Sequence, residues 1–406
     1  MTIIFTIIIN LWLFNKIIKG NNGQYRNIIL VNYLVRAIAL IGTCTDVIPL
    51  MSAHSDSDYF DDLATSNQNR SFSSWDIATN YTIFLSILYS FTDSSRWFAQ
   101  FLNMAMSVYT IVVLRQILFL FQIPSKTRKL VLLVMAFLPF YINYSVILVR
   151  ESWIIMFVTL SLYRFICWYI GKGNRNRNMI LSVIFLILGL WMHAGVICVL
   201  VGYFLAFITY DYKTNSIKLS RRSYVGFCFI ALMAVVIFVW RDVFLAKLMS
   251  EDTMDYIETK NTSEKANSAY LTWLEYSSPE KVLLFSPLKM FYFLYSPIPL
   301  NWRGLNDILA FLFDSSVFIV SSWYALTRSV YDERYKLLKK FLVISLLATT
   351  FVFAFGTVSS GDAIRHREKT MCILLIISAI STVKNKKRNK KTHRKFNEIT
   401  ISNTTR

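Results

Sequence analysis

Apolar residues in this chain come in long runs. Segments 130–148, 179–190 and 224–240 are long enough, alone or with their neighbours, to cross a hydrocarbon core ~30 Å thick. No segment alternates with a period of two, as a strand of a membrane barrel would, and lipid offers no hydrogen bonds to an open sheet edge. The pattern therefore predicts an all-α, polytopic helical membrane protein.

Composition and charge refine this picture. The chain has 406 residues, of which 55% are apolar and only 17% are charged, and its formal net charge is +19. The positive charge lies in short loops and in a Lys/Arg-rich tail, a distribution that favours membrane topology over nucleic-acid binding. We expect one transmembrane domain over residues 1–383 and a disordered basic cytoplasmic tail over 384–406.

The basic loops predict the orientation, because short cytoplasmic loops are enriched in Lys and Arg. They lie at 16–27, 126–129, 172–177, 213–222 and 328–340. The intervening loops, within the predicted outer segments 52–97 and 246–305, are acidic or mixed. A layout of about eleven spans, with the N-terminus outside and the C-terminus inside, places the basic loops on the inner side and the acidic or mixed loops on the outer side. These spans are placed near 2–18, 28–51, 98–121, 130–148, 152–170, 179–192, 194–210, 224–245, 306–327, 341–356 and 370–383.

Two further apolar segments, 77–91 and 282–300, do not cross in this layout. The first is short and carries Thr79, Asn80 and Thr82, and the second is interrupted by three prolines. Both suit interfacial or re-entrant helices, since irregular backbone is tolerated where it lines a cavity.

The predicted outer face receives basic and ionisable residues against the charge rule. They come from three separate hairpins: Arg150, Glu151, His193, Arg365, His366 and Arg367. The planar fork of arginine suits phosphate, so Arg150, Arg365 and Arg367 are candidate ligands of a diphosphate. Glu151 and His193 are candidate catalytic bases, because burial and neighbours tune both towards a neutral pKa.

Each of these residues also has a structural interpretation that stays open. Arg150 and Glu151 form an ion pair in that alternative, Arg365 and Arg367 reach to lipid headgroups, and His193 bonds a backbone carbonyl. The intramembrane arginines Arg36, Arg115 and Arg164 are costly to bury and are therefore functional candidates. For Arg36 and Arg164 the structural alternative is pairing with carbonyls or reaching to the membrane surface.

The acidic and aromatic outer segments are candidates for sugar binding. The residues are Asp56, Asp58, Tyr59 and Trp302, although a solvated loop and membrane-interface anchoring explain them equally well. The five cysteines are scattered in apolar segments and no metal-ligand spacing or nucleotide-binding motif is present. We therefore expect no metal and no cofactor.

Several short motifs together resemble the Wzy-type and EpsG-like bacterial polysaccharide repeat-unit polymerases. They are "DSDYFDD" in the first outer segment, "VRESW" opening a span, "MHAG" between two spans, and "GT…AIRHREK" before the last span. The resemblance covers most of the chain in layout. It implies a glycosyltransferase-type enzyme of the bacterial inner (plasma) membrane that joins undecaprenyl-diphosphate-linked oligosaccharide repeat units on the periplasmic face, making O-antigen or capsular polysaccharide.

The same resemblance implies roles and partners. Arg150, Arg365 and Arg367 would bind the diphosphate, while the choice of base between His193 and Glu151 stays open. The partners would be the lipid-linked oligosaccharide, membrane lipid and a chain-length regulator, with no nucleic acid. Two other classes remain: a lipid-linked oligosaccharide flippase, or another membrane transferase of the GT-C or glycan O-acetyltransferase type.

Overall fold

The computed structural model describes residues 1–19, 23–48, 50, 56–66, 77–218, 269–274, 279–330 and 332–383. The predicted span at 224–245, residues 246–268 of the second outer segment and the predicted tail at 384–406 lie outside the described residues.

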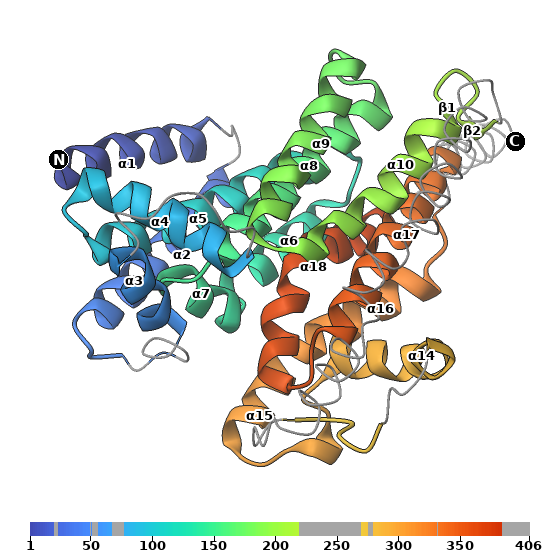
Figure 1. The fold of residues 1–406 in the computed structure, drawn as a ribbon. Coiled ribbons are helices and arrows are strands. Elements are labelled where there is room, and N and C mark those ends of the chain that lie inside the picture. Colours follow the sequence, from blue (N-terminus) through green and yellow to red (C-terminus); the bar gives the residue numbers. More distant parts are fainter. Residues whose placement is uncertain are drawn as a thin grey trace, which may run out of the picture.

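The described chain is almost entirely helical (Figure 1). Its first part runs through α1 (Thr2–Ile18), α2 (Gly23–Cys44), α3 (Asp56–Ser66), α4 (Ile77–Thr92), α5 (Arg96–Leu120), α6 (Ser125–Phe137), α7 (Pro139–Val146), α8 (Glu151–Ile170), α9 (Arg175–Met192), the 3₁₀ helix η2 (Ala194–Val199) and α10 (Leu200–Thr209). A small antiparallel hairpin follows, formed by β1 (Tyr210–Asp211) and β2 (Ser216–Ile217). The C-terminal part contains α14 (Pro279–Tyr295), η3 (Pro299–Asn301), α15 (Leu305–Ala310), the π-helical turn η4 (Phe311–Ser315), α16 (Ser316–Thr327), α17 (Glu333–Phe355) and α18 (Ser360–Ile380).

Among the described residues, five helical segments are long and apolar enough to cross a membrane: α2, α5, α8, the continuous stretch Leu305–Thr327 and α17. The pair α6 and α7, bent by 48°, would form a sixth span if the two helices cross together. The protein is therefore a multi-pass helical membrane protein, as the apolar runs predict.

The other predicted spans lack that length or composition. Helix α1 and the stretch Ala194–Thr209 are apolar but shorter, and α9 is not among the helices that are long and apolar enough to cross. Helices α4 and α14, which the sequence predicts not to cross, are not among them either. The last helix differs most from the sequence prediction. The predicted span at 370–383 is part of α18, which begins ten residues earlier, so Arg365, His366 and Arg367 belong to a helix and not to a loop.

The break between α6 and α7 has a proline as its cause. Pro139 has no N–H to donate and disfavours helical backbone at Leu138, which is extended. Buried side chains of α2 satisfy the freed carbonyls: the Asn32 amide donates to the Ala136 carbonyl, and Arg36 Nη1 donates to the Tyr141 carbonyl at 2.9 Å. Arg36 thus has a structural role as a partner of backbone carbonyls.

The basic segments meet at one end of the helical bundle. Arg115, near the end of α5, donates to the Lys16 and Ile17 carbonyls at 3.1 and 3.0 Å. Tyr169, at the end of α8, donates to the Arg334 carbonyl at 2.6 Å. The ring of Phe121, which follows α5, lies 5.3 Å from the ring of Tyr335 in α17. Together these contacts join the ends of α1, α5 and α8 to the start of α17, so three of the segments predicted to be cytoplasmic share one side.

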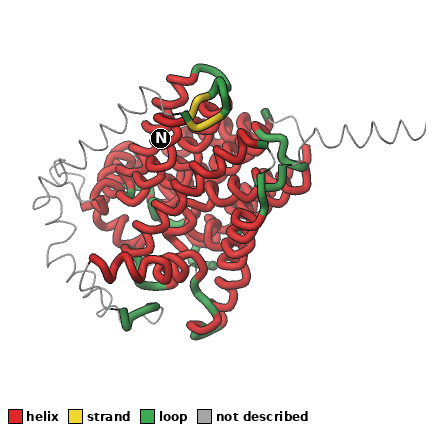
Figure 2. The backbone as a smooth tube through the Cα atoms, turned by 90° about the vertical axis from the view of Figure 1, so that its right-hand side faces the viewer, coloured by secondary structure: helices red, strands yellow, loops and turns green. Residues whose placement is uncertain are grey.

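Helix α18 lies at the centre of the bundle. It contacts α8 on one side and α14, α16 and α17 on the other, and most of its residues are buried. In Figure 1 the red α18 accordingly lies between the green α8 and the orange α14 and α16, while α10 runs beside α17, and Figure 2 shows the helices in closely packed rows.

Close helix packing at Gly202 yields a stability prediction. A Cβ at this position of α10 would overlap the Phe341 carbonyl oxygen and the Ser345 side chain of α17. We expect Gly202→Ala to lower the free energy of unfolding by about 1–3 kcal/mol, because backbone cannot yield to overpacking as a side chain can. Thermal unfolding of the purified protein in detergent measures this change. Gly23→Ala is the control, since nothing lies within 4 Å of its Cβ; equal losses in both variants would contradict the packing argument.

Candidate functional site

Helix α18 presents its charged residues on two faces. The helix starts after Ser359, whose hydroxyl accepts a hydrogen bond from the Asp362 N–H at 3.2 Å. Residues four apart share a face, so Arg365 and Lys369 point the same way, and Arg367, two residues on from Arg365, points elsewhere. One short segment therefore contributes to two different clusters.

The first face forms an ion pair with the start of α8. Arg365 meets Glu151 through two bonds, Nε to Oε1 at 2.6 Å and Nη2 to Oε2 at 3.3 Å. Its Nη1 also bonds Asp56, the first residue of α3. Glu151 is fully buried, whereas the Asp56 side chain is 40% exposed. Paired N–H···O bonds of this type are strong and fix the relative position of their partners.

Lys369 extends this pair into the bundle. Its ammonium lies 3.6 Å from Glu151 Oε1 and 2.7 Å from His366 Nδ1. An ammonium only donates, so Nδ1 of His366 accepts and the imidazole proton resides on Nε2. The His366 ring lies 5.0 Å from the ring of His193, and both rings contact Phe353.

His193 and Arg150 complete the arrangement. His193 occupies the connection between α9 and η2, and its Nδ1 is buried without a hydrogen-bond partner among the described residues. Arg150 Nη1 donates to the Met192 carbonyl at 3.1 Å, which ties the start of α8 to the end of α9. We call the following set the charged cluster: Asp56, Arg150, Glu151, His193, Arg365, His366 and Lys369.

The charged cluster carries an excess positive charge when Lys369 is protonated. Three cations, Arg150, Arg365 and Lys369, then face two carboxylates, Asp56 and Glu151, and burial lowers the pKa of Lys369 to about 7. Burial, together with the charges of Lys369 and Arg150, lowers the pKa of His193 to about 2, so this imidazole is neutral at neutral pH. The unbalanced positive charge makes the cluster suited to an anion.

Arg367 does not join this cluster, contrary to the expectation that it lies with Arg365. It is fully buried on the other face of α18 and pairs with Asp314 in the π-helical turn η4. It also donates to the Leu294 carbonyl at 3.0 Å, to the Ser296 carbonyl at 2.5 Å and to the Ser315 hydroxyl at 3.1 Å. Arg367 therefore links α14, η4 and α18, and its guanidinium is engaged by protein groups.

The four predicted sugar-binding residues do not lie together in the structure either. Asp56 belongs to the charged cluster through its bond to Arg365. Asp58 pairs with Arg96 of α5 at 2.6 Å, and Tyr59 is exposed beside Phe60. Trp302 follows η3, donates to the Pro297 carbonyl at 3.3 Å and packs on Phe311.

Sequence reasoning missed Lys369 and Asp314, and it placed His366 on the predicted outer face without a role. Lys369 was visible as an i+4 partner of Arg365, but only if residues 360–369 are helical, and their polarity indicated a loop. Asp314 lies in a long apolar segment, and the sequence contains no signal that pairs it with Arg367.

No group of His, Cys, Asp or Glu side chains within the described ranges is arranged to hold a metal ion. Four of the cysteines, Cys44, Cys167, Cys198 and Cys372, are free thiols. Comparisons with protein-family models, with curated proteins and with solved structures gave no match. Fold and site together thus define a class, a multi-pass helical membrane protein with a buried cationic cluster where α8 begins and α9 ends.

The buried pair yields a test of the cluster. Glu151→Gln leaves Arg365 and Lys369 without their buried counter-charge, so we expect a loss of about 3–5 kcal/mol in the free energy of unfolding. Adding Lys369→Met removes one of these cations and should recover part of the loss. Denaturant unfolding in detergent measures both changes.

Lys336→Met is the control for charge removal as such. Lys336 pairs with Glu333 at 3.2 Å on the surface of α17, where such pairs contribute less than ~1 kcal/mol. If Lys369→Met deepened the defect of Glu151→Gln, the two residues would not be partners.

Proposed function

We propose that this protein is a polysaccharide repeat-unit polymerase that uses undecaprenyl-diphosphate-linked oligosaccharides at the periplasmic face of a bacterial inner membrane. The observation that carries the proposal is the charged cluster, which concentrates buried cations at the end of α8 opposite to the basic loops. The resemblance of the sequence motifs supports the same reaction.

The proposed topology places this cluster outside the cell. The end that carries the basic loops faces the cytoplasm under the charge rule, so the start of α8 and the turn at His193 face the periplasm. About eleven spans meet this condition, with α4 and α14 lying in the outer leaflet. The product is O-antigen or capsular polysaccharide, and a chain-length regulator is a further proposed partner.

Arg150, Arg365 and Lys369 bind the diphosphate of the donor in this proposal. Arg365 already holds two carboxylates, of which Asp56 is the more exposed. A diphosphate oxygen displaces Asp56 and takes over its bond to Nη1, while Glu151 keeps the guanidinium in place. Arg367 positions α18 through Asp314 and does not touch the substrate.

The reaction is a displacement at the anomeric carbon. A hydroxyl oxygen of the acceptor sugar attacks this carbon and forms the new glycosidic bond, while the bond to the diphosphate oxygen breaks. Undecaprenyl diphosphate leaves with the electron pair, and the cations stabilise the negative charge that develops on it. The hydroxyl proton passes to His193.

His193 suits this role better than Glu151 does. Glu151 is fully buried and both of its oxygens bond Arg365, whereas Nδ1 of His193 has no partner among the described groups. Bound diphosphate offsets the positive charges that lower the pKa of His193, so the imidazole becomes more basic when substrate is present. Glu151 is accordingly a positioning residue.

A flippase for the same lipid-linked unit is the second candidate. It is favoured by Glu368 of α18, which is buried and has no hydrogen-bond partner for either carboxylate oxygen in the described part of the chain. Buried carboxylates of this kind serve as proton carriers in transporters.

Deleting the gene separates the two candidates. If the protein is the polymerase, the deletion strain should attach single repeat units to its lipopolysaccharide or capsule anchor, because units still cross the membrane but are not joined. Electrophoresis of the surface glycan measures chain length, and the plasmid-borne gene should restore long chains. Complete loss of surface glycan would instead indicate the flippase, and unchanged long chains would contradict both.

Substitutions in the charged cluster test the assignment of roles. Lysine keeps the charge of Arg150 or Arg365 but loses the paired bonds, so polymer length should fall in the order wild type, Lys, Ala at both positions. His193→Ala should slow polymerisation by ~10²–10⁴-fold with protein levels unchanged. Chain length in the complemented deletion strain is the measurement, with membrane levels determined by immunoblot.

Arg334→Lys is the matched control, because Arg334 forms an exposed pair with Asp332 at the opposite end of the bundle. It should leave chain length unchanged. Full-length polymer from both Arg150→Lys and Arg365→Lys would show that these residues do not clamp a diphosphate.

A further inference from the structure

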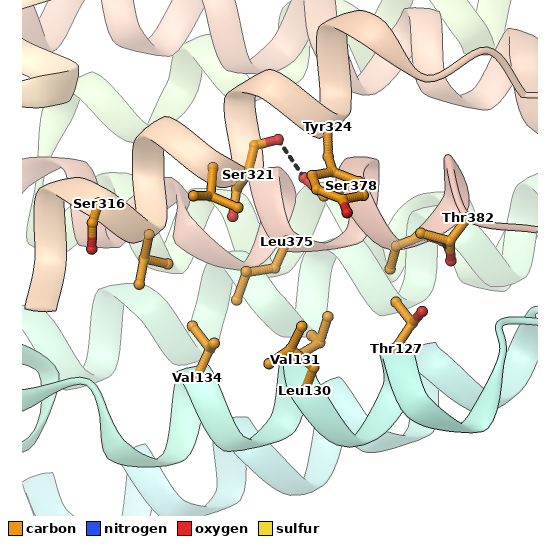
Figure 3. Close-up of a pocket in the computed structure, with 13 residues that line it drawn as sticks. Thr127, Leu130, Val131, Val134, Ser316, Ser321, Tyr324, Leu375, Ser378 and Thr382 are labelled. Carbon is orange, nitrogen blue, oxygen red and sulfur yellow. Dashed lines mark hydrogen bonds between the residues drawn. The ribbon is translucent and has the colours of Figure 1, made fainter.

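A groove of about 440 Å³ lies between α6 and α16, with α18 as its floor. Figure 3 shows Thr127, Leu130, Val131 and Val134 of α6 on one side and Ser316, Ser321 and Tyr324 of α16 on the other. Leu375 and Ser378 of α18, and Thr382 just after it, lie between them. No residue of the charged cluster lines this groove.

Three of the hydroxyl groups in the groove wall, those of Ser316, Ser378 and Thr382, already have acceptors in the protein. Ser378 donates to the Ser321 carbonyl at 2.7 Å and to the Leu374 carbonyl at 3.0 Å, the bond drawn to Ser321 being visible in Figure 3. Thr382 donates to the Ala379 carbonyl at 2.8 Å, and Ser316 donates to the Leu312 carbonyl. An occupant therefore need not supply acceptors for these donors, which favours hydrocarbon over a sugar or a headgroup.

The groove opens towards the surroundings of the bundle. Leu130 and Val320 at its edges are 61% and 55% exposed. Both edge helices belong to segments with the length and composition of membrane spans, the bent pair α6–α7 and the stretch Leu305–Thr327. In a bilayer these exposed apolar edges face lipid chains.

One end of the groove carries exposed positive charge. This end is marked by Thr127, the start of α6, and by Tyr324 near the end of α16. Lys126 directly precedes Thr127, and the Arg328 guanidinium lies 5.7 Å from the centre of the Tyr324 ring. These two cations lie at the end of an apolar channel, an arrangement that is the complement of an anionic headgroup attached to a hydrocarbon chain.

From the apolar channel and the two cations at its end we infer a binding site for one anionic phospholipid. One acyl chain occupies the groove between α6 and α16, and the phosphate group lies at Lys126 and Arg328. The site is distinct from the charged cluster and does not depend on the function proposed above.

Lipid binding to the full-length protein tests this site. Phosphatidylglycerol and phosphatidylcholine with the same acyl chains are added to protein in neutral detergent, and native mass spectrometry counts the bound molecules. Wild type should retain one phosphatidylglycerol with an affinity at least roughly tenfold above that for phosphatidylcholine, because each basic residue near an anionic group contributes to the attraction.

Two sets of variants locate the lipid. Val320→Trp places a large side chain at the groove edge and should weaken phosphatidylglycerol binding roughly tenfold or more, since the ring takes the volume of the chain. Ile319→Trp, its neighbour outside the groove, is the matched control and should bind like wild type. Replacing Lys126 and Arg328 by Gln should abolish the preference for phosphatidylglycerol, whereas the same replacement at Lys172 and Arg177 should preserve it.

If Val320→Trp does not fold, Val134→Phe takes its place in the experiment, because this substitution narrows the groove from the side of α6. Equal binding to wild type and to a correctly folded groove variant would overturn the site. So would equal affinity for the two phospholipids. Displacement of phosphatidylglycerol by equimolar undecaprenyl phosphate would assign the groove to the chain of a polyprenyl carrier and would overturn the inference as well.

Discussion

The arrangement of the site depends on the ion pair between Arg365 and Glu151. Glu151 is the first residue of α8 and is fully buried, so its charge must be compensated by groups that reach it inside the bundle. Arg365 and Lys369, one helical turn apart on α18, provide this compensation. The requirement sets both the depth and the rotation of α18 relative to α8, and it brings His366 against His193.

The rotation of α18 about its axis has a second consequence. Because Arg365 faces α8, Arg367 faces α14 and η4, where Asp314 and the carbonyls of Leu294 and Ser296 receive it. Buried ion pairs contribute little net stability compared with apolar packing, but removing one partner is costly. Two such pairs on opposite faces of α18 therefore restrict it to one orientation, which a purely apolar helix in this position would not achieve.

The division of charge between the two ends of the bundle connects fold with function. Basic loops meet at one end, where they suit the cytoplasmic side and the headgroups of anionic lipids. The charged cluster lies at the other end of α8, buried and with an excess of cations. A site of this type stabilises negative charge on a leaving group more effectively than exposed arginines would, because its groups are fixed in advance and water is largely excluded.

The sequence by itself determined the class of the protein, since only helices with long apolar runs satisfy their backbone hydrogen bonds in lipid. It also singled out Arg150, Glu151, His193 and Arg365, because charged residues next to apolar runs are costly and therefore conspicuous. Tertiary structure decided which of them meet. The polarity of residues 360–369 predicts a loop, but these residues form the first part of α18. They can be buried as a helix because Glu151 and Asp314, remote in sequence, neutralise Arg365 and Arg367 inside the bundle. Such pairings depend on how helices pack, and hydropathy along one chain carries no information about that.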